Sequence, residues 1–422
     1  MLFRSELSAP KNLTRNVLIG MGAGFIVGAF FFYTNITPQF FEDFFSTYIF
    51  SLGGDIFKNL LRLIVVPLVF FSLVSGISSL TDMARLGSIA YKTVGLYLLT
   101  TAIAVSLALF FGWVTNLGSG FSGDLVPTEL AGGEASFYDT VMRIFPSNMF
   151  GAFVENNMLG IVFISILFGI ALNATDSITG GLSKSFEKLN TVFLKIVLLV
   201  MQFAPIGVFC LIGTYVATKG LDIFGDVAQY VVLLIFVLVF HLIFTYSLIL
   251  TIFARLNPLK FFAKMKDVML FAFSTSSSAA TIPVTLKTVT QDLGVKKDVG
   301  SFVVPVGATI NMDGTAIMQG LATVFIAGIT PGIELGLVEY VQIIFLAVIT
   351  SIGTAAVPSA GIVTLTIILS QLGIPLEAIG LILAVDRILD MLRTSINVCG
   401  DAAVSCIVAK TERGLDEEVF NS

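Results

Sequence analysis

Near its carboxyl end, the amino-acid sequence predicts a helix with a cluster of polar side chains on one side. At about 100° per residue, these side chains project within one narrow arc. They are Asp386, Asp390, Arg393, Asn397 and Asp401. Ionisable groups at membrane depth are costly and usually mark a substrate or ion pathway. Three carboxylates against one guanidinium leave negative charge over, which indicates a bound cation. The alternative is a packed helix whose charges neutralise one another.

A second polar stretch, GATINMDGT at residues 307–315, lies in the middle of an apolar segment. Helix-breaking residues at this depth free backbone carbonyls to act as ligands, so we expect an unwound turn there. Asn311 and Asp313 would join Asn397 and Asp401 in an all-oxygen ligand set. Such a set suits a hard cation such as sodium, whereas a transition metal would favour His or Cys. The alternative is a kinked helix whose polar groups hydrogen-bond internally.

Hydroxyl groups on an earlier apolar segment could complete a second cation site beside Asp313. They belong to Tyr97, Thr100 and Thr101. Taken alone they mean little, because threonine often hydrogen-bonds to carbonyls of its own helix. The last polar helix also predicts an organic ligand: Arg393 matches a carboxylate with its planar fork, and Asp390 on the same face can accept an ammonium group. Together these groups describe an amino acid with an acidic side chain.

The composition narrows the class of protein. Of the 422 residues, 56% are hydrophobic and 12% are charged, and the mean hydropathy is +0.97. These values are typical of a polytopic membrane protein, and no basic stripe indicates nucleic-acid binding. The three cysteines have no paired spacing and are interpreted as packing residues. His241 lies in an apolar run and is interpreted as a core histidine rather than a metal ligand or proton relay.

Eight segments are apolar enough to cross about 30 Å of hydrocarbon. They are residues 16–34, 47–75, 93–115, 147–173, 190–217, 227–254, 299–328 and 378–409. The fourth is either one span or several short helices, because Pro146 and Gly151 interrupt it. Lysine and arginine cluster before the first segment and after the second, fourth and sixth. The positive-inside rule therefore places both termini in the cytoplasm.

Two further apolar segments have arms too short to be single spans. Residues 267–290 are centred on STSSSAAT and lie between two lysine-rich loops, and residues 340–370 are divided by GTAAVPSAG. We expect two re-entrant helical hairpins whose irregular tips line protein or a water-filled cavity near the midplane. The tips would offer backbone N–H groups to the second carboxylate of the ligand. This arrangement is typical of transporters with inverted repeats. The alternative for each hairpin is a tilted, weakly hydrophobic span.

With these motifs the chain resembles the glutamate transporter family, the dicarboxylate/amino acid:cation symporters, and most of all its prokaryotic sodium-aspartate transporters. The motifs, in order, are SSS at 276–278, NMDGT at 311–315, the second tip at 351–361 and DMLRTSINVCGD at 390–401. The resemblance implies an all-α polytopic membrane protein with eight transmembrane helices and two re-entrant hairpins, assembled as a homotrimer. It also implies an elevator motion, in which a transport domain slides across a fixed scaffold.

The resemblance divides the chain into scaffold and transport segments. The scaffold comprises residues 1–75, with trimerisation helices 1 and 2, and residues 119–217, with helices 4 and 5. The transport domain comprises residues 76–118, with helix 3, and residues 218–257, with helix 6. Its core, residues 258–422, holds hairpin 1, helix 7, hairpin 2 and helix 8.

The resemblance also implies roles for single residues. Substrate contacts match Thr275, Ser277, Thr315, Val357, Gly361, Asp390, Arg393, Thr394 and Asn397. One sodium ion matches Gly307, Asn311, Asn397 and Asp401. A second, closed by the second hairpin, matches Thr309, Ser351, Ile352 and Thr354. A third matches Tyr97, Thr100, Thr101, Asn311 and Asp313. Asp386 receives no ligand role and is interpreted as part of a structural salt bridge.

The chain departs from the family pattern at both hairpin tips. Prokaryotic relatives often carry an arginine just before the serine triplet, where this chain has Thr275, and Arg387 is a candidate substitute. Ala356 and Ser359 replace small or glycine positions in the second tip. These differences bear on the flexibility of the tips and the rate of gating rather than on the fold.

We interpret the chain as a secondary transporter of the inner membrane, not an enzyme, that couples entry of aspartate or glutamate to sodium entry. Sodium would order the second hairpin and the turn at 311–315 before the substrate binds. One alternative is a proton-coupled C4-dicarboxylate symporter of the same family. Another is an intramembrane aspartyl protease, in which two acids share a proton. Its expected Gly-x-Gly-Asp setting is absent, and nothing indicates a continuous pore.

Overall fold

The fold is helical throughout the part of the chain that the computed structural model describes. These residues are 13–34, 44, 48–78, 87–119, 142, 145–155, 157–219, 223–353, 360–376 and 378–422. Within these ranges the closest approach to a strand is one isolated β-bridge between Val295 and Leu415. The expectation of an all-α protein is confirmed for this part of the chain.

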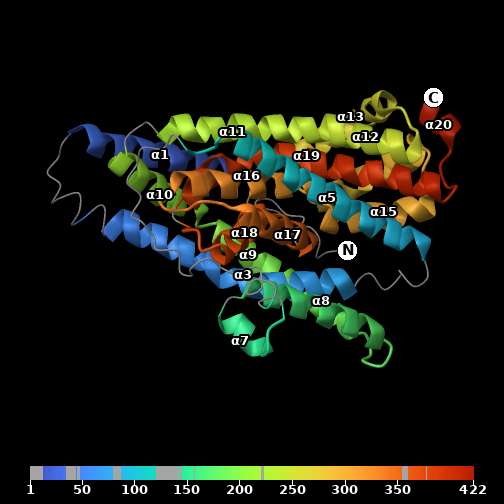
Figure 1. Ribbon diagram of the computed structural model, residues 1–422, viewed down its shortest axis with the longest axis horizontal. Coiled ribbons are helices and arrows are strands. Elements are labelled where there is room, and N and C mark those ends of the chain that lie inside the picture. The colour runs from blue at the N-terminus through green and yellow to red at the C-terminus, as the bar shows by residue number, and fades with distance from the viewer. Residues whose placement is uncertain are drawn as a thin grey trace.

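One group of helices comes from the amino-terminal half of the chain. Its long members are α1 (Leu13–Thr34), α3 (Leu52–Ser78), α8 (Met158–Thr175), α9 (Leu182–Met201) and α10 (Ala204–Lys219). In this group α1 packs along α10, and α3 packs against α8, α9 and α10. Figure 1 shows α3, α8 and the short α7 (Met149–Val154) together at one side of the molecule.

The contact between α1 and α10 depends on a row of glycines. Gly20, Gly24 and Gly28 recur every four residues and therefore lie on one face of α1. A Cβ atom on any of them would overlap the backbone of α10 between Pro205 and Ala217. Small residues at this spacing let membrane helices approach closely enough for their backbones to touch.

The second group surrounds the two polar segments that the sequence singles out. It contains α5 (Ser88–Val114), α11 (Ile223–Phe240), α13 (Pro258–Thr275), α14 (Ser278–Gln291), α15 (Lys297–Ile310), α16 (Asp313–Ile329), α17 (Leu337–Gly353), α18 (Ala360–Gln371), α19 (Ile379–Thr411) and the terminal α20 (Glu417–Asn421). Helix α19 packs against α13, α15 and α16, and α16 also packs against α5 and α18. Figure 1 shows α5, α11, α16 and α19 running along one another in the upper part of the molecule.

The sixth apolar segment is a single rod with two widened turns. After α11 come η4 (His241–Thr245), α12 (Tyr246–Ile249) and η5 (Leu250–Ala254), where η4 and η5 are π-helical. A π-helix bonds each N–H to the carbonyl five residues earlier, and such turns occur frequently at functional sites.

Two expected segments have a different form. The apolar segment 190–217 is divided, because the chain breaks at Gln202 and Phe203 between α9 and α10. Pro205 explains the break: it has no N–H to bond the preceding turn, but it is tolerated in the first turn of α10. For residues 147–173 the structure has the short-helix alternative, since the Asn148 side chain caps α7 and Asn157 caps α8.

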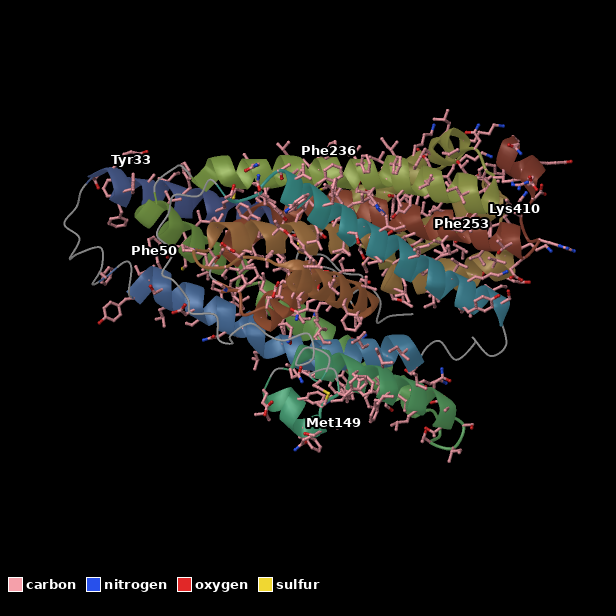
Figure 2. All side chains as sticks on the ribbon, viewed as in Figure 1. Tyr33, Phe50, Met149, Phe236, Phe253 and Lys410 are labelled. Atoms are coloured by element: carbon pink, nitrogen blue, oxygen red, sulfur yellow. The ribbon has the colours of Figure 1, made fainter. Side chains whose placement is uncertain are left out.

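Five helical stretches of the described residues are long and apolar enough to cross a membrane. They are Arg15–Thr34, Ser88–Val114, Val227–Ala254, Lys297–Ile329 and Ile388–Thr411. Nearly all of the last two is buried inside the protein, whereas less than a fifth of Arg15–Thr34 is buried. Apolar side chains such as Tyr33 and Phe236 lie at the periphery (Figure 2), as a lipid-facing surface requires. The protein is therefore an integral membrane protein, and the number of eight spans stays a prediction.

The two expected hairpin segments are each divided into two helices. The first divides at Ser276, which has a positive φ of 49°, and Ser277, which caps α14. The second divides between α17 and α18, and the residues from 354 to 359 are outside the described ranges. The break positions agree with the polar centres of both segments. That each hairpin enters and leaves on the same side of a membrane stays a prediction.

Candidate functional site

The chain unwinds between α15 and α16, where the sequence predicts an unwound turn. Asn311 has an extended conformation, with φ −88° and ψ 91°, and its N–H closes α15 by bonding the Gly307 carbonyl at 2.8 Å. Gly307 has no room for a side chain, because a Cβ atom there would overlap Asp401 Oδ1 and Tyr97 Oη. The absence of a side chain at Gly307 therefore lets the Asp401 carboxylate and the Tyr97 hydroxyl approach the backbone of α15.

The Asn311 amide joins this turn to α19. Its Nδ2 donates to the Asn397 carbonyl at 3.1 Å and to Asp401 Oδ1 at 2.9 Å. The side chain of Asn397 makes a second contact with the turn, because its Oδ1 accepts from the Gly314 N–H at 2.8 Å. The structure therefore brings together all four residues expected around the first sodium ion, with Gly307 against Asp401 and Asn311 bonded to Asn397 and Asp401.

Hydroxyl groups of α5 meet the first carboxylate of α16. Thr101 Oγ1 donates to Asp313 Oδ1 at 2.7 Å, and Thr100 Oγ1 lies 3.3 Å from the same oxygen. Thr100 Oγ1 also lies 3.4 Å from Asn311 Oδ1. Tyr97 Oη bonds the Val303 carbonyl at 3.0 Å and borders Gly307. These five residues, expected around a third sodium ion, form one buried cluster.

Two residues that the sequence interpretation missed hold the other side of Asp313. Tyr246 Oη donates to Asp313 Oδ2 at 2.9 Å, and His241 Nε2 lies 3.2 Å from the same atom. His241 is buried, as expected of a core histidine, but its ring contacts the polar centre rather than only apolar neighbours. Its position in an apolar run concealed this contact.

The Arg393 guanidinium lies in the centre of the second group of helices and is completely buried. Its Nη2 pairs with Asp386 Oδ1 and with Asp390 Oδ1, the second at 2.9 Å. The interpretation of Asp386 as part of a salt bridge fits this pairing. In the part of the chain that the structure describes, Nε and Nη1 of Arg393 and Oδ2 of Asp386 have no hydrogen-bond partner.

The second hairpin approaches the guanidinium at the start of α18. A Cβ atom on Gly361 would lie 3.1 Å from Arg393 Nη1 and 2.8 Å from Thr315 Cγ2. Gly314 packs equally closely on the backbone of Arg393. Four residues expected to contact the substrate, Thr315, Gly361, Asp390 and Arg393, therefore lie close together. Asn397 is joined to the same region by its bond to the Gly314 N–H.

The remaining predicted substrate contacts are tied to local structure. Thr275 Oγ1 lies 3.3 Å from Thr281 Oγ1 at the break between α13 and α14, and Ser277 caps α14. Thr394 Oγ1 bonds the Asp390 carbonyl of its own helix at 2.8 Å. Helix α19 is fastened to α13 where Ser395 Oγ donates to the Met269 carbonyl at 2.8 Å. The roles of Thr275, Ser277 and Thr394 stay predictions.

The second sodium site is described only in part. Ser351 Oγ lies 3.4 Å from the carbonyl of Ile310, the last residue of α15. Thr309 bonds its own helix, through Oγ1 to the Val306 carbonyl at 2.9 Å. The other expected groups lie outside the described residues: Thr354 and Val357, together with Ala356 and Ser359 of the same tip, and the side chains of Ile352 and Arg387.

The buried charges of the described residues do not balance. Four carboxylates are buried, and they belong to Asp313, Asp386, Asp390 and Asp401. Arg393 is the one buried guanidinium or ammonium among these residues. Buried charges are stable only when they are paired, bound to a cation or neutralised by a proton, so the arrangement favours the binding of sodium ions or protons.

Apolar spans that enclose a buried, acidic, partly unwound core define a membrane protein with an ion or solute site inside the bilayer. The chain matches the sodium:dicarboxylate symporter family over residues 13–411 and belongs to that family. The family resemblance proposed from the motifs is confirmed. Because this is a family of transporters and not of enzymes, the protease alternative is not supported.

Curated relatives match along nearly the full chain. A proton/sodium-glutamate symport protein of Bacillus subtilis is 31% identical over 409 residues, covering 95% of this chain and 92% of that protein. A proton/glutamate-aspartate symporter of Escherichia coli is 31% identical over 422 residues, covering 96% and 94%. The human excitatory amino acid transporter 2 is 31% identical, covering 85% and 72%. The name of the Bacillus subtilis relative includes protons and sodium, that of the Escherichia coli relative includes protons, and that of the human relative includes no ion.

Proposed function

We propose that the chain is a secondary active transporter that couples the entry of an acidic amino acid, aspartate or glutamate, to the entry of sodium. The observation that carries the proposal is the burial of the Arg393 side chain together with its incomplete hydrogen bonding. Its guanidinium is completely buried, and two of its nitrogens have no partner among the described residues. A buried donor without a partner is costly, and a carboxylate is the ligand that matches a guanidinium best.

Asp390 supports an amino acid rather than a simple dicarboxylate. One of its oxygens now accepts from Arg393 Nη2 at 2.9 Å. A ligand carboxylate that binds the guanidinium would take over part of this role and free Asp390 for the ammonium group of the same ligand. A dicarboxylate has no ammonium group and would leave Asp390 beside a second negative charge, which is unfavourable.

Sodium coupling rests on the oxygen-rich clusters and on the charge excess. The proposed first and third ions would bind among carboxylate, amide and hydroxyl oxygens, ligands that suit hard cations. Asn397 connects the ions to the ligand: its carbonyl faces Asn311, and its side chain holds the N–H of Gly314, beside Thr315. Ions that order residues 311–314 would therefore shape the ligand space, which is the coupling free energy that symport requires.

The elevator motion and its domain boundaries are part of the same proposal. The packing of α1 with α10, and of α3 with α8 and α9, supports a scaffold made from residues 1–75 and 119–217. The packing of α19 with α13, α15 and α16 supports a transport unit that moves with its ligands. Re-entrant hairpins, a homotrimer, inner-membrane location, cytoplasmic termini and the second sodium site complete the proposed design.

The test is uptake of radiolabelled L-aspartate into proteoliposomes under separately imposed sodium and proton gradients. The proposal predicts accumulation only with an inward sodium gradient. Accumulation driven by a pH gradient without sodium would refute sodium coupling and favour a proton-coupled carrier, a possibility that the name of the Escherichia coli relative keeps open. Succinate that is taken up as well as aspartate would favour the C4-dicarboxylate alternative.

A further inference from the structure

The rod formed by α11, η4 and α12 contacts Asp313 on the side away from the α5 hydroxyls. Asp313 Oδ1 accepts from Thr101, whereas Oδ2 accepts from Tyr246 and faces His241 Nε2. A carboxylate only accepts hydrogen bonds, so His241 Nε2 is a donor here. The other ring nitrogen, Nδ1, has no hydrogen-bond partner within the described ranges. Asp313 is therefore the hydrogen-bond partner that holds this buried ring.

The π-helical turn η4 is what allows both residues to reach one atom. In an α-helix, residues five apart differ in direction by about 140°. In η4 the Tyr246 N–H bonds the His241 carbonyl five residues earlier, so the turn is wider than an α-helical turn and the two side chains point in more similar directions. Their rings meet edge to face with centroids 4.9 Å apart. A spacing of five residues would direct the two side chains apart on an α-helix, but on this π-helical turn His241 and Tyr246 lie next to one another.

We propose that His241 and Tyr246 are positioning residues for the cation site at Asp313. They fix Oδ2, so that Oδ1 stays directed at Thr100, Thr101 and Asn311, where the cation binds. Neither residue is among the predicted ligands, and both act through Asp313. Preorganised ligands bind more tightly because less freedom is lost on binding. This inference rests on the proposed sodium coupling and adds the groups that set the affinity for the ion.

The test measures L-aspartate binding to the full-length purified protein across a range of sodium concentrations. Tyr246→Phe removes only the hydroxyl group, and His241→Leu removes the ring donor. For each variant we expect the sodium concentration at half-saturation to rise about tenfold, the cost of losing a hydrogen bond to a charged group. At saturating sodium the affinity for aspartate should stay near that of the unchanged protein. His241→Gln, which keeps a donor at a similar reach, should recover most of the sodium affinity.

Tyr230→Phe is the matched control. Tyr230 is also completely buried and lies on α11, but its hydroxyl has no hydrogen-bond partner among the described residues. Its loss should leave the sodium half-saturation unchanged. If Tyr246→Phe and His241→Leu bind sodium as well as the unchanged protein, the positioning role is overturned while sodium coupling stands. If the unchanged protein binds aspartate without sodium, the proposed function fails first and this inference fails with it.

Discussion

Asn311 and Asp401 are joined side chain to side chain, with the amide Nδ2 donating to Oδ1 of the carboxylate at 2.9 Å. This bond connects the unwound turn after α15 to the middle of α19, 90 residues further along the chain. A sodium ion at the proposed first site would become the partner of Asp401. The turn and the last helix would then be held together by the ion as well as by the amide.

Asp401→Asn should weaken sodium binding. The substitution keeps the size of the side chain but removes the buried charge that attracts the cation. We expect the sodium concentration needed for half-maximal aspartate binding to rise more than about tenfold, because removing one partner of a buried ion pair is costly. Asp416→Asn, at the exposed cap of α20, is the control. An unchanged sodium requirement in Asp401→Asn would exclude this carboxylate from the ion site.

Arg393→Cys should abolish uptake of acidic amino acids while sparing the binding of a neutral one such as serine. Truncation of a buried charged donor typically weakens binding by about 2–5 kcal/mol. The change also leaves Asp386 and Asp390 without their cation, so thermal stability should fall. Adding Asp386→Asn should restore much of that stability without restoring aspartate binding, which separates recognition from folding. Unchanged affinity for aspartate in Arg393→Cys would show that the guanidinium is not the carboxylate clamp.

Gly361→Ala should reduce aspartate binding through a steric contact that can be relieved. The new Cβ atom would lie 2.8 Å from Thr315 Cγ2 and 2.9 Å from Met318 Cε, closer than carbon atoms tolerate. Overpacking of this kind typically costs about 1–3 kcal/mol. Thr315→Ser removes the methyl group and should recover part of the affinity in the double variant. Gly95→Ala, where a Cβ atom meets nothing within 4 Å, is the control, and equal losses in both single variants would contradict the steric account.

The carboxylate at the end of α19 should make the stability of the protein depend on acid pH. Hydrogen bonds from Lys92 and Ser88 lower the pKa of Glu412 below its ordinary value. A lowered pKa stabilises the fold above the unfolded value of about 4.3, and this stabilisation is lost as the pH falls through the folded value. Glu412→Gln should therefore lower the melting temperature at neutral pH, and the difference from the unchanged protein should close below about pH 4. A difference of the same size at acid pH would refute the ionic contribution.

The sequence predicts the elements around the site well, for a physical reason. Polar or helix-breaking residues in an apolar segment have few stable placements, so NMDGT predicts the unwound turn at Asn311 and the serine triplet predicts the break at Ser276. A shared helical face likewise predicts that Asn397 and Asp401 lie together. The pairing of Asp386 with Arg393 follows from the same periodicity.

Two features of the structure escape this reasoning. The break between α9 and α10 is a local effect of Pro205, but apolar composition on both sides conceals it. The contact of His241 with Asp313 has no signal in α-helical periodicity, because only the π-helical turn puts His241 and Tyr246 on one face. The spacing of five between two polar residues in an apolar rod was the available clue.

The most direct test of coupling uses the gradient of the amino acid, instead of the sodium gradient, as the driving force. Proteoliposomes with equal sodium concentration on both sides receive an inward gradient of L-aspartate, and the net movement of radioactive sodium is measured. Because coupling between two ligands is reciprocal, the account predicts that aspartate drives sodium inward, and that Arg393→Cys shows no such movement. Aspartate that enters without moving sodium, accompanied instead by acidification of the interior, would contradict the account.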